Sequence, residues 1–223
     1  MTTPPRCREI LDRGEHVLIG ISLRNSYFSE ERITELLRWS SDVFRRIDVI
    51  IPDAADVETW LALGYSDAQA WKKTRSTASR IRNRVARARV AAGVPAERFR
   101  QFMLSEFTSR SDYQSAMRRC EEGIACDSAL RALFLRPAGQ ALRPHLCSSE
   151  PTPAQAEMAM RYFIAEMPML LDARGLLETE STTIVYHRRL DYLDRIISGE
   201  TPLRMCRKQA FVVVRPRLTG IEV

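Results

Sequence analysis

Long apolar runs, metal-ligand patterns and paired cysteines are all missing from this chain of 223 residues. No apolar run approaches the ~20 residues needed to span a bilayer, so we expect no association with a membrane. The five cysteines form neither a CxxC pair nor a cluster with histidine. An odd cysteine count without an evident signal peptide is typical of reduced thiols, so the sequence predicts a soluble, cytoplasmic protein without a bound metal.

Nucleotide-binding motifs and internal repeats are also missing. Neither the GxGxxG nor the P-loop pattern occurs, so the usual nucleotide chemistries lack support and we expect no cofactor. No linker or low-complexity tract divides the chain, and its length fits one α/β domain. We therefore expect a single domain over residues 1–223, loosely held over about 1–13. We also expect a monomer or weak dimer.

Short apolar runs alternate with helical patterns along the chain. Five runs are typical of strands: Val17–Ile21, Val49–Ile51, Phe99–Leu104, Thr183–Tyr186 and Ala210–Val214. Helix-starting pairs, with a serine or threonine three residues before a glutamine, occur at Ser66/Gln69, Ser111/Gln114 and Thr152/Gln155. Because strands that alternate with helices pair in parallel, the sequence predicts an α/β, Rossmann-like domain with a sheet of about five strands flanked by helices.

The helical segments between these runs differ in pattern. A helix is expected after Ser29, and the helix that follows Ser66 should end near Gly93. Residues 110–136 are expected to be wholly helical and to pack on one face or edge of the sheet. The run RPAGQALRPH, from Arg136 to His145, combines prolines with a glycine, so we expect it to be the most loop-like segment.

The positive charge of the chain is concentrated in one segment. Of the 34 basic residues, eight lie between Lys72 and Arg89 with no acidic residue among them, so the other 26 face 28 acidic residues. On a helix, one stripe would face the sheet: Thr74, Ala78, Ile81, Val85 and Ala88. Four cations gather on a second face: Lys73, Arg80, Arg84 and Arg87. A solvated face usually mixes both signs, but no carboxylate answers these cations, which indicates a phosphate-backbone partner.

Ser22 stands where an apolar strand ends, in the stretch HVLIGISLRNSYFS. In an open α/β sheet, ligands bind at the carboxyl ends of the strands. The spacing from Gly20 matches part of the G-x-S-x-G nucleophile elbow, but Arg24 replaces the second glycine. From the residues alone, Ser22 is therefore either a nucleophile or a serine that only terminates a strand.

Two later motifs also bring chemistry-bearing side chains together. Tyr162 and Glu166 are four residues apart, so on a helix they project from one face. Their neighbours are apolar, and a glutamate in such company is a better candidate for buried chemistry than a solvated one. Tyr186 and His187 close the run TTIVYH at the end of another strand, where a histidine has either a functional or a capping role.

Taken in order, GISLRNSYFS, the acid-free basic segment, YFIAE, VYH and QAFVVVRP resemble the cyclodipeptide synthase family, over about residues 14–217. The resemblance implies a Rossmann fold like the catalytic domain of class I tyrosyl- and tryptophanyl-tRNA synthetases. The family lacks the ATP-binding motifs of those synthetases, as this sequence does. The resemblance therefore implies that the amino acids arrive already activated, as aminoacyl-tRNAs.

The same resemblance implies roles for individual residues. Ser22 matches the family nucleophile, which accepts the first aminoacyl group as an ester. Tyr162 and Glu166 match the pair that grips the amino group, with Glu166 as the proton shuttle. Tyr186 matches a hydroxyl that supports the later cyclisation.

The branch, the pocket and the tRNA contacts follow from family position in the same way. Asn25, Tyr186 and His187 match the Asn/Tyr-His branch. The first aminoacyl pocket is expected to be lined by Leu18, Gly20, Ile50, Leu104, Met169 and Ile184. None of these residues is charged, so we expect an apolar first amino acid, such as leucine, methionine or phenylalanine. The basic face, although Asn83 interrupts it, matches the element that holds the first tRNA.

The sequence thus predicts a cyclodipeptide synthase that joins two amino acids from aminoacyl-tRNAs into a 2,5-diketopiperazine through a seryl ester. Two other classes stay open at this point. One is a serine hydrolase in which Ser22 and His187 act without tRNA, and the other is a non-catalytic RNA-binding module. The three differ in the small products that they form from charged tRNA.

Overall fold

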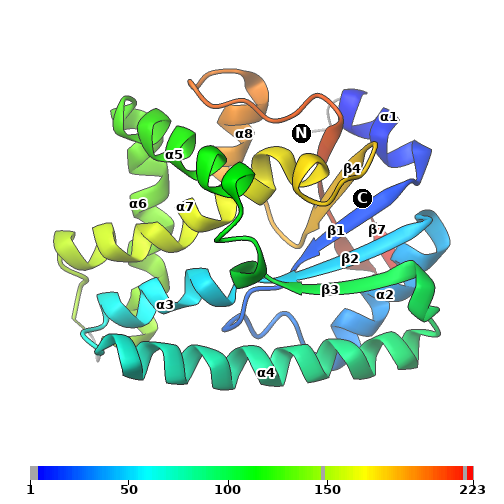
Figure 1. The fold of residues 1–223 in the computed structure, drawn as a ribbon, viewed down its shortest axis with the longest axis horizontal. Coiled ribbons are helices and arrows are strands. Elements are labelled where there is room, and N and C mark those ends of the chain that lie inside the picture. The colour runs from blue at the N-terminus through cyan, green and yellow to red at the C-terminus, as the bar shows by residue number, and fades with distance from the viewer. Residues whose placement is uncertain (1–4, 147–148, 218–219, 223) are drawn as a thin grey trace.

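The sheet at the centre of the molecule has five parallel strands in the order β3-β2-β1-β4-β5 (Figure 1). The computed structural model describes residues 5–146, 149–217 and 220–222. The strands are β1 (His16–Gly20), β2 (Arg46–Ile51), β3 (Phe99–Met103), β4 (Thr182–Tyr186) and β5 (Gln209–Val213). These are the five expected strands, so the predicted α/β class and the parallel pairing are confirmed. A small antiparallel pair follows, made of β6 (Arg215–Arg217) and β7 (Gly220–Glu222).

Helices cover both faces of the sheet. The helices are α1 (Pro5–Arg13), α2 (Glu30–Val43), α3 (Asp53–Ala62), α4 (Asp67–Ala92), α5 (Ser111–Ala125), α6 (Ser128–Leu142), α7 (Pro153–Leu176) and α8 (Asp191–Ser198). Three short 3-10 turns are η1 (Ala96–Arg98), η2 (Leu104–Glu106) and η3 (Arg143–His145). Helices α2 and α4 pack on one face, and α7 packs on the other with α3, α5 and α6 around it (Figure 1).

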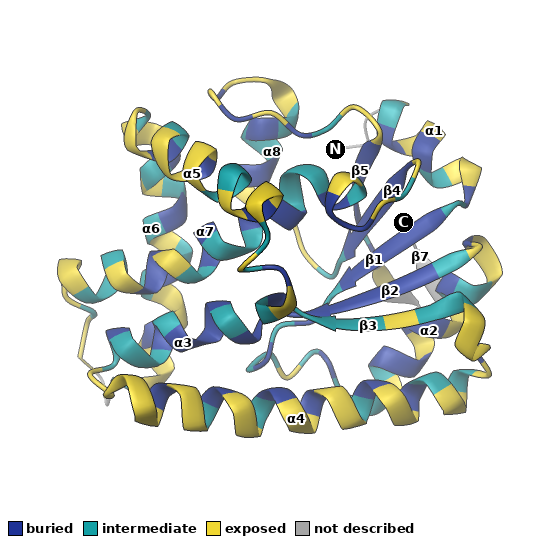
Figure 2. Cartoon of the chain, in the orientation of Figure 1, coloured by how far each residue is buried: buried dark blue, intermediate teal, exposed yellow. Residues whose placement is uncertain are grey.

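Successive side chains of each strand point to opposite faces of the sheet. Val17 and Ile19 of β1 belong to the apolar cluster that α2 and α4 complete. Leu18, between them, belongs to the cluster that α7 completes. Figure 2 shows β1, β2 and β4 buried along most of their length, the edge strand β3 partly exposed, and the outward side of α4 exposed along its length. The predicted stripe of α4, from Thr74 to Ala88, is confirmed because all its members are buried.

The helix ends follow the capping patterns of the sequence in most cases. The Ser29 hydroxyl accepts from the backbone N–H of Arg32 and starts α2. The Ser66/Gln69 pair starts α4, which ends at Gly93 in the left-handed conformation with φ of 73°. The Thr152/Gln155 pair starts α7, with Pro153 at the first helical position. These three starts were predicted from the sequence and are confirmed.

The Ser111/Gln114 prediction is wrong. Helix α5 is preceded by Arg110, and no side-chain cap forms there. The Gln114 amide donates instead to the Thr108 carbonyl oxygen, while the Arg110 guanidinium pairs with Asp112. Residues 111–136 are helical, as expected, except for a break at Cys126 and Asp127, where α5 ends at Ala125 and Asp127 caps the separate helix α6.

The expected loop at residues 136–145 is also wrong, because this run continues α6 and then forms η3. Four residues spaced by four form the buried stripe of α6: Leu130, Phe134, Ala138 and Leu142. Burial of this stripe outweighs the turn signal of Pro137, which lies inside the helix. Burial also holds α1 in place within the segment that was expected to be loosely held. Cys7 and Ile10 of α1 are buried against Ala210 of β5. Residues 1–4 lie outside the described part of the chain.

Candidate active site at the carboxyl end of the sheet

A cavity of about 540 Å³ opens where the carboxyl ends of β1 and β4 meet α3 and α7. The six residues that the sequence predicted as an aminoacyl pocket all line it: Leu18, Gly20, Ile50, Leu104, Met169 and Ile184. Five of the predicted chemical residues also line it: Ser22, Asn25, Tyr162, Glu166 and Tyr186. The fold therefore brings together side chains as distant in the sequence as Ser22 and Tyr186, which are 164 residues apart.

Ser22 lies just beyond β1, at the edge of the cavity. Its Oγ is 2.8 Å from the hydroxyl oxygen of Tyr186, the last residue of β4. Strands β1 and β4 are hydrogen-bonded neighbours, so their ends meet at the same edge of the sheet. Burial raises the pKa of Tyr186, so this hydroxyl stays protonated and can donate to or accept from Ser22.

Asn25 and His187 form a second contact beside this pair. The Asn25 amide Nδ2 lies 2.8 Å from Nε2 of His187, so that ring nitrogen is the acceptor. Burial, helped by the charge of Arg188, lowers the pKa of His187 to about 4, which keeps the ring neutral. The Tyr27 ring stacks on His187 with 4.3 Å between centroids, and the Tyr27 N–H donates to Asn25 Oδ1. His187 therefore orients Asn25 and lies behind the cavity wall, not in its lining.

Tyr162 and Glu166 lie on successive turns of α7, as predicted. The Tyr162 hydroxyl donates to Oε1 of Glu166 at 3.3 Å. Burial raises the pKa of Glu166 to about 8, although the hydrogen bond from Tyr162 opposes the rise. Burial, reinforced by the charge of Glu166, also raises the pKa of Tyr162. A carboxyl group with a pKa near neutrality can both hold and release a proton at the cavity wall.

The floor of the cavity is apolar. Leu18, Ile50 and Ile184 come from three neighbouring strands and belong to the same buried cluster. A Cβ added to Gly20 would meet no atom within 4 Å, so glycine here leaves part of the cavity open. An apolar group is therefore the favoured occupant of this floor.

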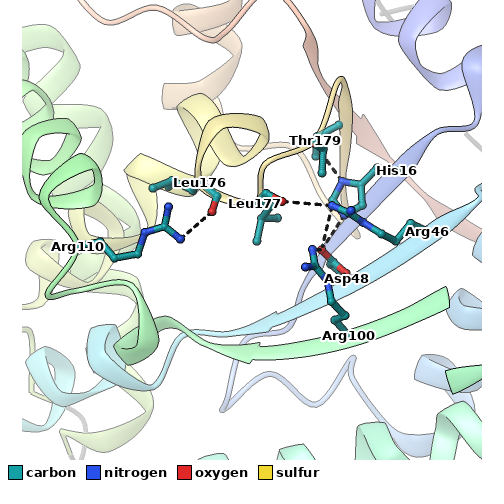
Figure 3. Close-up of polar contacts among 9 residues, drawn as sticks. His16, Arg46, Asp48, Arg100, Arg110, Leu176, Leu177 and Thr179 are labelled. Atoms are coloured by element: carbon teal, nitrogen blue, oxygen red, sulfur yellow. Dashed lines mark hydrogen bonds and ion pairs between the residues drawn. The ribbon is translucent and has the colours of Figure 1, made fainter. Parts of the chain in front are cut away.

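A polar cluster at the other end of the same sheet face was missed from the sequence (Figure 3). We define the amino-end cluster as His16, Arg46, Asp48, Arg100 and Thr182. Arg100 donates to both oxygens of Asp48, at 3.1 and 2.6 Å. His16 Nε2 lies 3.0 Å from Asp48, and its Nδ1 lies 3.1 Å from the Thr182 hydroxyl. The signal that could have revealed it is a lone aspartate inside the apolar strand RIDVII.

The amino-end cluster keeps its carboxylate ionised. Burial alone would raise the pKa of Asp48, but hydrogen bonds from His16 and Arg100, with the Arg100 charge, outweigh it and lower that pKa. Burial lowers the pKa of His16, so its ring is neutral near neutral pH. Arg46, another member of the cluster, donates a hydrogen bond to the carbonyl oxygen of Leu177 at the end of α7, at 3.3 Å (Figure 3).

The predicted basic face lies along α4, but its four members differ in environment. Arg80 is exposed, and its contact is with Thr77 of the same helix. The Lys73 ammonium lies over the Trp60 ring at 4.8 Å from the centroid. Arg84 donates to the Phe28 carbonyl oxygen at 2.8 Å.

Arg87 has an acidic partner, contrary to the sequence prediction. Its guanidinium pairs with the Glu30 carboxylate at 2.7 Å. The prediction failed because α2 and α4 pack together and bring in a carboxylate from another element. Arg80 is therefore the cleanest probe of an anion-binding face, since its guanidinium contacts no other element in the described part of the chain.

No cluster of three or more histidine, cysteine, aspartate or glutamate side chains is placed to hold a metal among the residues described. Over those residues, no helix combines the length and apolar character needed to cross a membrane.

The fold has solved counterparts. A structure from Mycobacterium tuberculosis superposes with a TM-score of 0.79 and 27% identity over 96% of this chain and 91% of that one. It is described as demonstrating that cyclodipeptide synthetases are related to type I tRNA synthetases. The molecule is thus an α/β domain whose solved counterparts are related to type I tRNA synthetases. The cyclodipeptide synthase family model matches residues 1–216, and the chain belongs to the cyclodipeptide synthase family.

Characterised relatives agree along nearly the whole chain. The cyclo(L-leucyl-L-phenylalanyl) synthase of Streptomyces noursei is 33% identical over 220 residues, covering 95% of this chain and 89% of that protein. The cyclo(L-leucyl-L-leucyl) synthase of Bacillus subtilis is 31% identical, covering 94% of this chain and 86% of that one. The chain is therefore an enzyme that forms cyclodipeptides from aminoacyl-tRNAs.

Proposed function

We propose that Ser22 carries the growing dipeptide as an ester while two aminoacyl-tRNAs are used in turn. The observation that supports this most is the shared cavity, in which Ser22 Oγ contacts Tyr186 beside an apolar floor. An aminoacyl ester of tRNA needs no further activation, so a positioned hydroxyl accepts the acyl group by transesterification. The Oγ–C bond forms, the ester bond to the tRNA ribose breaks, and the serine proton leaves on the ribose oxygen.

Glu166 then acts as the proton acceptor for the bound amino group. The carboxylate form holds the α-ammonium of the first residue and takes its proton, which releases a nucleophilic amine. That amine attacks the ester carbonyl of the second aminoacyl-tRNA, so an amide bond forms and the ester bond to the second ribose breaks. The proton that the amine loses leaves on the ribose oxygen of the departing tRNA. The dipeptide stays on Ser22 because the bound residue supplies the nucleophile. The pKa of Glu166, raised by burial to about 8, suits a group that alternates between these two states.

Tyr186 serves the last step. The amine of the second residue attacks the seryl ester, so the ring closes and the Ser22–carbonyl bond breaks. The serine oxygen takes up a proton as it leaves, and the Tyr186 hydroxyl at 2.8 Å is placed to relay to it the proton that the attacking amine loses. The contact between Asn25 and His187 supports assignment to the Asn/Tyr-His branch of the family.

The apolar floor selects the first amino acid. Its six lining residues carry no charge, which favours leucine, methionine or phenylalanine over charged side chains. An apolar pocket discriminates between similar side chains by only ~1–3 kcal/mol, so several related products are expected. The relatives named for leucyl and phenylalanyl products agree with this choice.

The exposed cations of α4 hold the tRNA through its phosphates. Reversing Arg80 and its exposed neighbour Arg82 to glutamate should weaken the binding of tRNA without unfolding the domain. Each lost phosphate contact should lower the log–log slope of affinity against salt by roughly 0.7–0.9. The same reversal at Arg8 and Arg119, exposed on other helices, is the matched control.

The experiment that tests this assignment is incubation with a mixture of charged tRNAs and mass spectrometry of the small products. We expect diketopiperazines that contain leucine, methionine or phenylalanine. A product profile dominated by a charged amino acid would contradict the pocket assignment. Free amino acids as the sole product would contradict the transfer mechanism.

A further inference from the structure

Arg24 is the residue that breaks the nucleophile-elbow pattern, and the mechanism above gives it no role. It lies two residues after Ser22, in the loop between β1 and α2, and lines the cavity. Its Nε is 3.0 Å from Oδ1 of Asp56 on α3. The Asp56 side chain is 1% exposed and that of Arg24 is 23% exposed, so this ion pair is largely shielded from water.

The Asp56 carboxylate is contacted by donors from the loop after β1, from α3 and from α4. In addition to Arg24, its Oδ2 accepts from the indole N–H of Trp60 and from the hydroxyl of Thr74, each at 3.0 Å. Trp60 lies on α3, and Thr74 lies on the buried stripe of α4. A carboxylate held by three donors is fixed in place, so its role is to position its partners.

Arg24 also touches a third wall of the cavity. Its guanidinium carbon lies 4.9 Å from the centroid of the Trp60 ring, and Nη1 lies 3.5 Å from Nε2 of His145 in η3. A planar guanidinium suits this task because it can pair with a carboxylate and stack on an aromatic ring at once. One side chain therefore ties the loop that carries Ser22 to α3 and to η3.

The other side of the loop is held by different contacts. Asn25 is fixed by His187, and the Phe28 carbonyl oxygen accepts from Arg84. The segment that contains Ser22 is thus fastened at both ends, with Arg24 holding the end that faces α3. Release of that end would let the serine oxygen drift from Tyr186, and misplacement by about 1 Å can lower a rate ~10²-fold.

We propose that Arg24 and Asp56 are a positioning pair that holds Ser22 in register with Tyr186 for acyl transfer. This inference rests on the proposed role of Ser22 as the acyl acceptor. The pair lies apart from the exposed side of α4, so its loss should slow the acylation of Ser22 without weakening tRNA binding.

The test uses single-turnover labelling of the full-length enzyme with radioactive leucyl-tRNA, quenched with acid at timed intervals. The variants are Arg24→Met, Arg24→Lys, Asp56→Asn and the double variant Arg24→Met/Asp56→Asn. Arg195→Met, which removes the cation of the distant Arg195–Glu200 pair, is the matched control. Thermal unfolding and the leucyl-tRNA concentration at half-maximal rate are measured for each variant.

We expect Arg24→Met to lower the limiting acylation rate about 10–100-fold with an unchanged half-saturating tRNA concentration. Arg24→Lys should recover part of the rate because an ammonium keeps the charge next to Asp56. The double variant should be no slower than the slower single variant, since residues that act as a pair are not additive. If Asp56→Asn does not fold, the two Arg24 variants decide the matter.

An Arg24→Met enzyme that acylates Ser22 within twofold of the wild-type rate would overturn the proposal. So would a rate loss that appears only as weaker tRNA binding. Failure of the underlying mechanism looks different, because the wild-type enzyme itself would then retain no acid-stable label that Ser22→Ala abolishes.

Discussion

Two carboxyl groups on the side of the sheet that α7 covers behave in opposite ways. Asp48, in the amino-end cluster, is fully buried and accepts two hydrogen bonds from Arg100, so its pKa is lowered. Glu166, at the carboxyl end, has a tyrosine hydroxyl as its hydrogen-bond partner among the described residues, and burial raises its pKa to about 8. Burial alone therefore does not mark a functional carboxyl group. What separates a structural from a reactive one is whether a cation of the protein neutralises it.

The largest expected effect of this difference is on turnover. Glu166→Gln keeps the shape of the side chain but removes the proton acceptor, so it should lower the rate of cyclodipeptide formation by about 10²–10⁴-fold. Asp48→Asn, the same chemical change at the other end of the sheet, should leave the rate per folded molecule within a few-fold of wild type. Initial rates, normalised to the folded fraction by circular dichroism, measure both. Equal losses in the two variants would break the comparison.

The same two variants should differ in the sign of their effect on stability. Asp48→Asn removes the ionic partner of Arg100, whose side chain is 43% exposed, and should lower the free energy of unfolding by about 1–3 kcal/mol. Glu166 has a raised pKa in the folded state, so its stability contribution is complete below the unfolded pKa and is lost as pH rises toward 8. Glu166→Gln should therefore match wild type at about pH 4 and be roughly 2–3 kcal/mol more stable at about pH 8. Urea unfolding at the two pH values tests this, and a destabilised Glu166→Gln at the higher pH would refute it.

The pH dependence of acylation sharpens the role of Glu166. The ionised carboxylate binds the substrate ammonium, and ionisation increases as pH rises through the pKa of about 8. The apparent second-order rate of Ser22 labelling should thus rise as pH approaches about 8 and fall above it, because the α-ammonium of the substrate itself loses its proton near pH ~8. Quenched-flow labelling over short times avoids hydrolysis of the tRNA ester. If the labelling rate of Glu166→Gln rises over the same pH range as that of the wild type, a group other than Glu166 is responsible for the rise.

Tyr162→Phe should lower turnover less than Glu166→Gln does. It removes the hydroxyl that donates to Glu166 but leaves the carboxyl group in place. Because that hydrogen bond lowers the pKa of Glu166, its loss should move the pH limb to a higher value. Turnover at neutral pH should fall about tenfold, in line with one hydrogen bond to a charged group. A loss as large as that of Glu166→Gln would contradict the division of roles.

Local patterns of the sequence were sufficient for the sheet and for most helix starts. The five apolar runs became the five strands, and the capping pairs at Ser66 and Thr152 became helix starts. The apolar stripe of α6 was overlooked because Pro137 and Gly139 were interpreted as loop signals. Packing of α6 against α7 makes this segment helical. Such long-range packing is not visible in a local window of sequence.

The site shows the same division. Ser22, Tyr162 and Glu166 were found because motif and helical spacing place them locally. Arg24 and Asp56 are 32 residues apart on different elements, so their pairing depends on how α3 meets the loop after β1. Long-range ion pairs of this kind require the sheet register, which a single sequence does not contain.

The central claim is that Ser22 holds the acyl group, and acid-quenched labelling tests it most directly. Wild-type enzyme and Ser22→Ala are mixed with radioactive leucyl-tRNA, denatured in acid and examined for label bound to protein. Because the exposed face of α4 is intact in the variant, its tRNA affinity serves as the internal control. The account predicts label on the wild-type protein, none on Ser22→Ala, and no cyclic dipeptide from the variant. Equal label on both proteins, or full synthesis by the alanine variant, would show that Ser22 only ends a strand.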